Sequence, residues 1–305
     1  MSSDLLALDV GQSGSRARFI CDGEVVAEND LAGILSDKPQ VPQLAALVMQ
    51  ASALSERSAT QVAIGSSGID ERVTAKALLE LVGAAGVQRM ALTHDSVAGY
   101  LGALAQNRGV VVAAGTGAVT LAVGTNSVAR VDGWGNLIGD AGSGYWIGRA
   151  ALEMVLRAHD GRGPETALTA MVQQDFPDLE LSYLELQRDP RKVSRIASYA
   201  KIVSGLAGTD EVSRSILESA AGELATSAVT ALRRVGELDQ FSTLVASVGQ
   251  VFKSKVLTGR FNTFVREQVP GAQIVKPLGT AVDGAAQLFD IDPEFPLANR
   301  IDIAE

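Results

Sequence analysis

The sequence predicts an α/β protein made of two related halves, each with its own mixed β-sheet. Along the chain, short runs typical of strands, either continuously apolar or alternating between polar and apolar, are followed by stretches whose apolar residues recur at helical spacing. A hairpin pattern with a turn of glycine and hydroxyl residues begins each half. The length of 305 residues suits two domains at roughly 150 residues per domain.

The first half opens with a predicted three-stranded meander. Residues 5–8 form a continuously apolar run, residues 16–20 alternate between polar and apolar, and residues 24–28 follow a turn at Asp22 and Gly23. Beyond the meander we expect helices over 44–54, 71–81 and 96–106, and strands over 61–64 and 88–92. Asp95 directly precedes the third of these helices, where it is a favoured N-cap residue.

At Gly109 a second series of predicted strands and helices begins, again with a glycine-turn hairpin. We expect strands over 110–113 and 119–123, a third strand near 127–130, a glycine-dense loop over 131–148, and a mainly helical region from 150 to 235 that is broken at 161–164. A strand over 243–248, a helix over 251–267, a strand over 272–275 and a helix over 281–289 complete the chain. This predicts domains over 1–108 and 109–305, the second with a helical insertion, and leaves the last helix able to pack back on the first domain.

Composition narrows the possible partners. The net charge of −9 argues against nucleic acid, because contacts to phosphate backbones need clustered lysine and arginine. Cys21 is the only cysteine, which excludes an internal disulfide and a cysteine-ligated metal within one chain. The start of the sequence lacks a signal-peptide pattern, and no apolar run is long enough to span a bilayer. We therefore expect a cytoplasmic protein that has no membrane partner.

Common nucleotide and hydrolase motifs are missing. The sequence contains no G-x-x-x-x-G-K-[ST] run, no dinucleotide-binding G-x-G-x-x-G after a strand, no H-E-x-x-H and no G-x-S-x-G. Two aspartates at predicted strand ends remain. Asp9 opens no helix and suits Mg²⁺ held through water. Asp95 has two compatible interpretations, as a helix cap and as a base that accepts a hydroxyl proton.

Several motifs then occur in a characteristic order. They are D-x-G-x-[ST]-G from Asp9, the strand-end Asp95, A-G-T-G before Ala118, the block G-W-G-N-L-I-G-D-A-G-S-G-Y-W-I-G, and S-V-G-Q-V-F. Together they resemble the N-acetylglucosamine kinase branch of the sugar kinase, Hsp70 and actin superfamily, the branch grouped with the BadF/BadG/BcrA/BcrD ATPases. The resemblance covers residues 5–288, and the G-W-G block is its most specific part.

The resemblance implies an architecture and an activity. The fold would be two ribonuclease-H-like (actin-like ATPase) domains with mixed five-stranded sheets and an interdomain cleft. The activity would be ATP- and Mg²⁺-dependent phosphorylation of a small-molecule sugar of the N-acetylglucosamine or glucosamine type, at the 6-hydroxyl. A homodimer is compatible with it.

The resemblance also implies roles for individual residues. Asp95 would be the catalytic base, and Asp9 would hold the metal. The nucleotide would be bound by Gly11, Gln12, Ser13, Gly115, Thr116, Gly205, Gly249 and Gln250. The sugar would be bound by Gly117, Ala118, Gly133, Trp134, Gly135, Asn136 and Asp140. For Trp134 two interpretations stay open: stacking on a pyranose face, or filling the core, which is the commoner role of a tryptophan among glycines.

Some residues depart from the family pattern. Gln12 stands where a glycine is usual, Ala118 and Val119 replace polar residues, and Leu35 and Ser36 occupy a loop that often offers an asparagine to the sugar. These departures leave open an N-acetylmuramic acid or other hexose kinase, and also a non-catalytic sugar or nucleotide sensor.

Three further classes fit less well. An iron–sulfur activator ATPase and a ROK-type protein both need cysteines that this chain lacks. An actin-like filament protein is disfavoured by the sugar-type G-W-G block.

Overall fold

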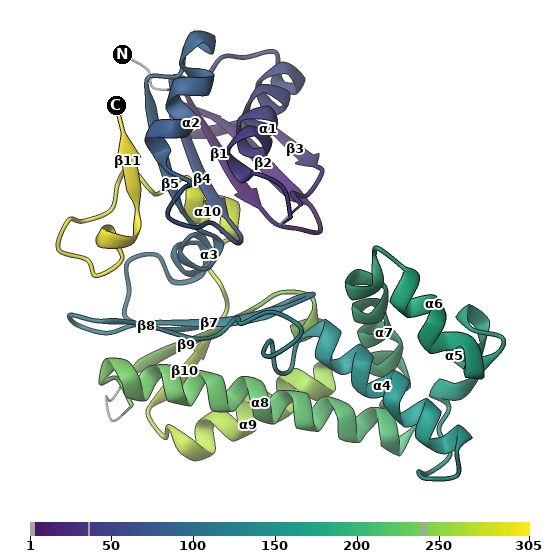
Figure 1. Cartoon of the computed structure of the whole chain (residues 1–305). Helices are drawn as coiled ribbons and strands as arrows, with labels where there is room; N and C mark the ends of the chain where they lie inside the picture. Colours follow the sequence, from purple (N-terminus) through teal and green to yellow (C-terminus); the bar gives the residue numbers. More distant parts are fainter. Residues whose placement is uncertain (1–3, 36, 239–241) are drawn as a thin grey trace. The chain divides into compact units, whose positions relative to one another are not determined.

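The computed structural model describes residues 4–35, 37–238 and 242–305, so Ser36 lies outside the described part. The chain divides into two compact units, which we describe separately (Figure 1). The first unit comprises Met1–Val111, Val123–Val128 and Lys276–Glu305, and the second comprises Val112–Ala122 and Ala129–Val275. The predicted α/β class with two mixed sheets is confirmed. Within the described residues, no helix has both the length and the apolar character needed to cross a bilayer.

The first sheet has six strands, in the order β11-β5-β4-β1-β2-β3. Their bounds are β1 Leu5–Val10, β2 Ser15–Cys21, β3 Glu24–Leu31, β4 Gln61–Ser66, β5 Arg89–His94 and β11 Asp302–Ala304. The prediction of five strands missed β11, which pairs antiparallel with β5. This strand has only three residues and lies at the edge, so its sequence carries almost no alternation.

Strands β1, β4 and β5 run parallel, and their register brings their carboxyl ends to one edge of the sheet. Asp9 pairs with Gly65, and Gly65 pairs with Thr93. At the next position Ser66 pairs with His94. The residues that follow these pairs therefore leave neighbouring strands at the same edge.

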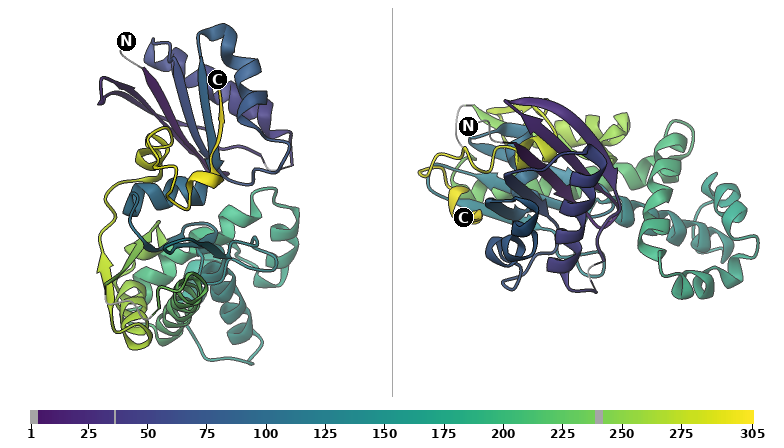
Figure 2. Two further views of the ribbon diagram at one scale, coloured as in Figure 1. Left: turned by 90° about the vertical axis from the view of Figure 1, so that its left-hand side faces the viewer. Right: turned by 90° about the horizontal axis from the view of Figure 1, so that it is seen from above.

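Successive side chains of a strand point to opposite faces of the sheet, so the core of the first unit has two parts, one on each face (Figure 2). Leu6 and Leu8 belong to the core cluster that contains the buried residues of helices α1 and α2. Ala7 instead packs with residues of helices α3 and α10. Small residues let the backbones of α3 and of the segment that leads into α10 approach each other closely. A Cβ on Gly102 would clash with the backbone carbonyl of Thr280. The helices are α1 Gln40–Ser55, α2 Ala75–Val82, α3 Asp95–Leu104 and α10 Ala281–Ala285.

Several helix starts differ from the prediction, and two of those in the first unit have a visible local cause. Helix α2 begins at Ala75 instead of residue 71, because the Thr74 hydroxyl accepts a hydrogen bond from the backbone N–H of Ala77 at 3.2 Å. The expectation that Asp95 caps α3 is wrong. His94 is the N-cap, and Asp95 is the first residue of the helix.

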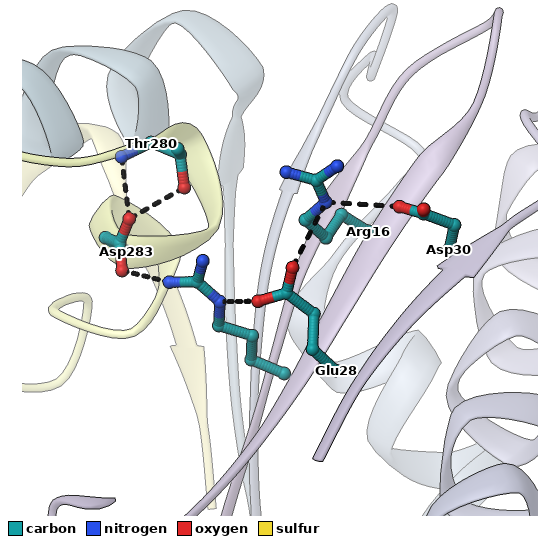
Figure 3. A network of polar contacts seen from close by, with 6 residues as sticks. Arg16, Glu28, Asp30, Thr280 and Asp283 are labelled. Carbon is teal, nitrogen blue, oxygen red and sulfur yellow. Dashed lines mark hydrogen bonds and ion pairs between the residues drawn. The ribbon is translucent and has the colours of Figure 1, made fainter. Parts of the chain in front are cut away.

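A polar network joins helix α10 to the first sheet (Figure 3). Arg18 on β2 forms ion pairs with Glu28 on β3 and with Asp283 on α10. The Asp283 carboxylate also accepts hydrogen bonds from the backbone N–H and the hydroxyl of Thr280, at 2.6 and 2.7 Å. These bonds, with the pairing of β11 to β5, attach the C-terminal segment to the first unit. Helix α10 ends at Ala285, four residues before the predicted end.

The second sheet has five strands, in the order β10-β9-β6-β7-β8. Their bounds are β6 Gly109–Ala114, β7 Ala118–Val123, β8 Val128–Asp132, β9 Thr243–Val248 and β10 Ala272–Val275. The helices of the second unit are α4 Gly144–His159, α5 Leu168–Asp175, α6 Ser182–Arg188, α7 Lys192–Leu206, α8 Glu211–Val235 and α9 Lys255–Gln268. A short 3₁₀ helix over Val251–Lys253 precedes α9, where one continuous helix was predicted.

Candidate active site

The residues predicted to form the site fall into two groups, one in each unit. The first unit holds Asp9, Gly11, Gln12, Ser13 and Asp95. The second unit holds Gly115, Thr116, Gly117, Ala118, Gly133, Trp134, Gly135, Asn136, Asp140, Gly205, Gly249 and Gln250. Each group is described by itself below.

Asp9 is a half-buried carboxylate at the carboxyl edge of the parallel strands. Burial, and after it the negative charge of Asp95, raise the pKa of Asp9 to about 6, while Arg16 partly opposes the rise. Asp9 therefore lies close enough to Asp95 for the two carboxylates to interact electrostatically. A cation at this edge would favour the ionised form of Asp9.

Asp95 lies at the N-terminus of α3, where the helix dipole stabilises a negative charge. The His94 ring nitrogen Nδ1 accepts a hydrogen bond from the backbone N–H of Ser96 at 3.2 Å and lies 2.7 Å from Asp95 Oδ1. The distance between Nδ1 and Oδ1 is that of an ion pair when the His94 ring is protonated, and Nδ1 also lies 2.9 Å from Ser96 Oγ. Asp95 Oδ1 is buried and has no hydrogen-bond partner among the described residues. The carboxylate therefore keeps an oxygen available to accept a proton.

The first glycine turn is closed by its own backbone bonds. The Gly11 N–H donates to the Gly14 carbonyl at 3.1 Å, and the Gly11 carbonyl accepts from Ile34 N–H at 3.1 Å. Gln12 and Ser13 lie exposed on this turn. The Gly11 N–H is therefore already engaged in a hydrogen bond within the turn. The exposed residues Gln12 and Ser13 are the ones we expect to contact a ligand.

A cavity of about 740 Å³ lies in the second unit. Four residues predicted to bind the nucleotide line it together: Gly115, Thr116, Gly205 and Gln250. One face of helix α7 supplies a wall of small and polar residues, namely Ser194, Ala197, Ser198, Lys201 and Ser204. Across the described lining, the charged residues are Lys201 and Lys253, and no acidic residue is present. In a chain with a net charge of −9, this cavity favours an anionic ligand.

Backbone bonds join the second glycine hairpin to helix α4. The carbonyls of Gly115 and Thr116 accept hydrogen bonds from the N–H groups of Gly144 and Tyr145, at 2.8 and 3.0 Å. Gly249, at the end of β9, has a φ of +105°, and a Cβ there would clash with the backbone of Ala114 on β6. A glycine is thus required at residue 249, although this residue is not part of the described cavity lining.

Two aspartates hold the loop that carries the G-W-G motif. Asp132 and Asp140 both have left-handed backbone conformations, with φ of +58° and +56°. The Asp132 carboxylate accepts from the N–H groups of Asp140 and Ala141, at 2.8 Å each. Asp140 Oδ1 accepts from Gly135 N–H at 3.1 Å. The loop between these two aspartates is therefore tied at both ends by carboxylate bonds.

Asp140 is almost fully buried beneath this loop. Burial raises the pKa of Asp140, as does the nearby charge of Asp132, while hydrogen bonds from the backbone of Gly135 and Ala118 oppose the rise. A Cβ on Gly117 would lie 2.6 Å from Asp140 Oδ2, so a larger residue there would require the Asp140 side chain to shift. Gly117, Ala118, Gly135 and Asp140 therefore form one contact cluster.

The interpretation of Trp134 as core filler is wrong. Its side chain is 65% exposed, and the Arg130 guanidinium stacks on the ring at 5.2 Å from the centroid. Because the carboxylates hold the loop away from the core, its large side chains face solvent. Leu137 and Ile138 on the same loop are 88% and 85% exposed, and Gly133 and Asn136 are half-buried.

Sequence reasoning missed Lys201, Lys253 and His94. A lysine on an exposed helical position is ordinary, so only the cavity distinguishes Lys201 and Lys253. His94 stands directly before Asp95, and this adjacency was a usable signal. Among the residues that the structure describes, no group of three or more His, Cys, Asp or Glu forms a metal cage.

Comparison with known proteins identifies the class. The model of the BadF/BadG/BcrA/BcrD ATPase family matches residues 44–288. The chain belongs to this family, and membership of an ATPase family implies that it is an enzyme that uses ATP.

Several individual proteins are similar to this chain. The N-acetylmuramic acid/N-acetylglucosamine kinase of Clostridium acetobutylicum is 28% identical over 234 residues, covering 73% of this chain and 75% of that protein. The N-acetyl-D-glucosamine kinase of Dictyostelium discoideum is 31% identical over 186 residues, covering 59% and 58%. A crystal structure from Chromobacterium violaceum, of a protein with a proposed N-acetylglucosamine kinase activity, has a TM-score of 0.72 at 25% identity, covering 93% and 97%.

Proposed function

We propose that this chain is an ATP-dependent kinase of an amino sugar of the N-acetylglucosamine or glucosamine type, acting at the 6-hydroxyl. The observation that carries the proposal is Asp95. It stands at the carboxyl edge of the parallel strands beside Asp9, with a buried carboxylate oxygen that has no partner among the described residues. The names of the two curated relatives supply the substrate class.

Asp95 suits the role of a general base. Phosphoryl transfer needs little covalent help from a protein, so catalysis depends on aligning the attacking oxygen and neutralising phosphate charge. The unpartnered Oδ1 of Asp95 is placed to accept the proton of the sugar hydroxyl as that oxygen attacks the phosphoryl group. The N-terminus of α3 stabilises Asp95 as an anion before the transfer.

Asp9 suits the role of the residue that holds Mg²⁺. Burial and the charge of Asp95 raise the pKa of Asp9, so a bound cation would relieve an unfavourable pair of charges. A single carboxylate is enough when phosphate oxygens and water complete the shell of six oxygen ligands. Bound there, Mg²⁺ would neutralise phosphate charge during transfer.

The cavity in the second unit suits the nucleotide. Its two lysines favour a polyanion, and the small residues on α7 leave room for a ribose and a flat base. We place the phosphates near Gly115 and Thr116 and the adenosine between Gly205 and Gln250. In the first unit, we assign Gln12 and Ser13 to the binding of the terminal phosphates.

The G-W-G loop suits the sugar. Trp134 presents an exposed ring, and Asp140 fixes the backbone of Gly135. We place Gly117, Ala118, Gly133 and Asn136 beside the same sugar. A cytoplasmic location would supply the ATP that the reaction needs, and a homodimer is compatible with the proposal.

N-acetylmuramic acid is the second candidate substrate. The Clostridium relative is named for both sugars. Ala118 and Val119 stand where polar residues are usual, so the polar side chains that would face the sugar at these two positions are missing.

The test is sugar-dependent release of ADP. The purified chain is given ATP, Mg²⁺ and a panel of N-acetylglucosamine, glucosamine, N-acetylmuramic acid and glucose. We expect ADP release to rise with an amino sugar and to fall to background without it. Sugar binding without any turnover would replace the kinase with a sensor.

A further inference from the structure

Four buried side-chain atoms have no hydrogen-bond partner among the described residues: Gln40 Oε1, Ser67 Oγ, Asp95 Oδ1 and Asn262 Oδ1. Buried polar atoms in folded proteins are almost always paired, so each exception needs a reason. The residues that carry the first three lie at one place in the first unit, the carboxyl edge of its parallel strands. Asn262 belongs to helix α9 in the second unit.

The strand register brings Ser67 and Asp95 to the same edge. Ser66 and His94 pair at the ends of the adjacent parallel strands β4 and β5, so Ser67 and Asp95 are the residues that directly follow these two strands. Neighbouring strands lie about 4.8 Å apart. The backbone N–H of Ser67 donates to the Val10 carbonyl at 2.9 Å, which fixes the start of this turn to β1.

Gln40, the first residue of α1, is bonded to the same turn. Its Nε2 donates to the carbonyls of Gly68 and Ser67, at 3.0 and 3.4 Å. Carbonyls only accept, so the amide must present its NH₂ group to both, and this fixes the orientation of the side chain. Gln40 Oε1 is left as an acceptor without a donor.

The chemistry of the three atoms selects one kind of ligand. The oxygens of Gln40 and ionised Asp95 can only accept hydrogen bonds, whereas the Ser67 hydroxyl can donate or accept. A phosphate group close to full ionisation offers few donors and cannot satisfy them. A sugar carries O–H donors on neighbouring carbons, and an amino sugar adds an N–H donor.

We propose that Gln40 and Ser67 bind the acceptor sugar beside Asp95 and help to determine its specificity. This inference deepens the proposed kinase function and rests on it. Asp95 Oδ1 receives the reacting hydroxyl, Ser67 Oγ pairs with a second hydroxyl, and Gln40 Oε1 accepts an O–H or the amide N–H of the same sugar.

The test compares two variants with matched controls. Ser67→Ala removes the unpaired Ser67 Oγ, and Gln40→Met removes the unpaired Gln40 Oε1 together with the two bonds that Nε2 donates to the turn. Gln50→Met, on an exposed position of the same helix, and Ser58→Ala, on an exposed position, are the controls. Each variant is assayed for the KM of sugar and of ATP, for sugar affinity by calorimetry, and for thermal stability.

We expect the KM and the dissociation constant for the sugar to rise about tenfold in each test variant, with the KM for ATP and both controls unchanged. A second measurement does not depend on how Gln40→Met folds. Each singly deoxygenated sugar is bound to the wild-type chain and to Ser67→Ala. The analogue that lacks the hydroxyl bound by Ser67 should lose no further affinity in the variant.

Unchanged sugar affinity in Ser67→Ala, or affinity losses that simply add for every deoxy analogue, would overturn the inference. The proposed function is judged separately, because it fails only if the wild-type chain shows no sugar-dependent ADP release.

Discussion

Removing the charge of Asp9 should make the protein more stable and less active. In the folded chain the pKa of Asp9 is about 6, compared with an ordinary value of 3.8. A difference of about two units corresponds to ~3 kcal/mol of unfavourable free energy once Asp9 is ionised. Asp9→Asn keeps the shape of the side chain and removes this cost. We therefore expect its free energy of unfolding at pH 7.5 to exceed that of the wild type by up to ~3 kcal/mol.

The pH dependence follows from the sign of the shift. Because the folded chain holds the Asp9 proton more tightly than the unfolded chain, the wild type loses stability as pH rises from about 4 to about 6, and the loss is complete above that range. The advantage of Asp9→Asn should therefore shrink towards pH 4. The assay is urea denaturation at both pH values, with the exposed Asp37→Asn as control.

Activity should move in the opposite direction. Since Asp9 is proposed to hold Mg²⁺, Asp9→Asn should lose most ADP release and much of its dependence on Mg²⁺ concentration. An Asp9→Asn variant no more stable than the wild type at pH 7.5 would refute the electrostatic reasoning.

Three further predictions concern the proposed chemistry. Asp95→Asn should fold normally and lose sugar-dependent ADP release by several orders of magnitude, since the proton acceptor is gone; near-normal turnover would remove Asp95 as the base. Asp140→Ala should raise the KM for sugar at least tenfold more than that for ATP, because the loop loses its bond to Gly135; the reverse ratio would mean that the two substrates are exchanged in our assignment. The double variant Lys201→Ala/Lys253→Ala should weaken ATP binding in calorimetry about tenfold and leave sugar binding intact, whereas equal ATP affinity would place the phosphates elsewhere.

The sequence predicted most of the strands, because apolar runs and alternation are local signals. The failures occur where distant contacts decide the structure. Strand β11 exists only because β5 offers it an edge, and three residues carry no period of their own. Helix α10 stops at Ala285, although the apolar pattern suggested that it continued.

The residues of the candidate site in the second unit were predictable to different degrees. Gly115, Thr116, Gly205 and Gln250 were named from motifs far apart in the sequence, and one cavity contains all four. The exposure of Trp134 was not predictable, since it depends on carboxylate bonds that hold the loop outward.

Other functional candidates carry no motif at all. Gln40 and Ser67 become notable only when the fold buries one oxygen of each without a partner. The cap formed by His94 in place of Asp95 depends on the rotamer of one side chain, which a residue pattern does not contain.

The product of the reaction tests the central claim most directly. The chain is incubated with ATP, Mg²⁺ and N-acetylglucosamine, and the mixture is followed by phosphorus NMR alongside the Asp95→Asn variant. The account predicts that a sugar 6-phosphate signal appears with the wild-type chain and that it is absent with Asp95→Asn. Signals of ADP and inorganic phosphate without a sugar phosphate signal, or equal sugar phosphate from both proteins, would contradict it.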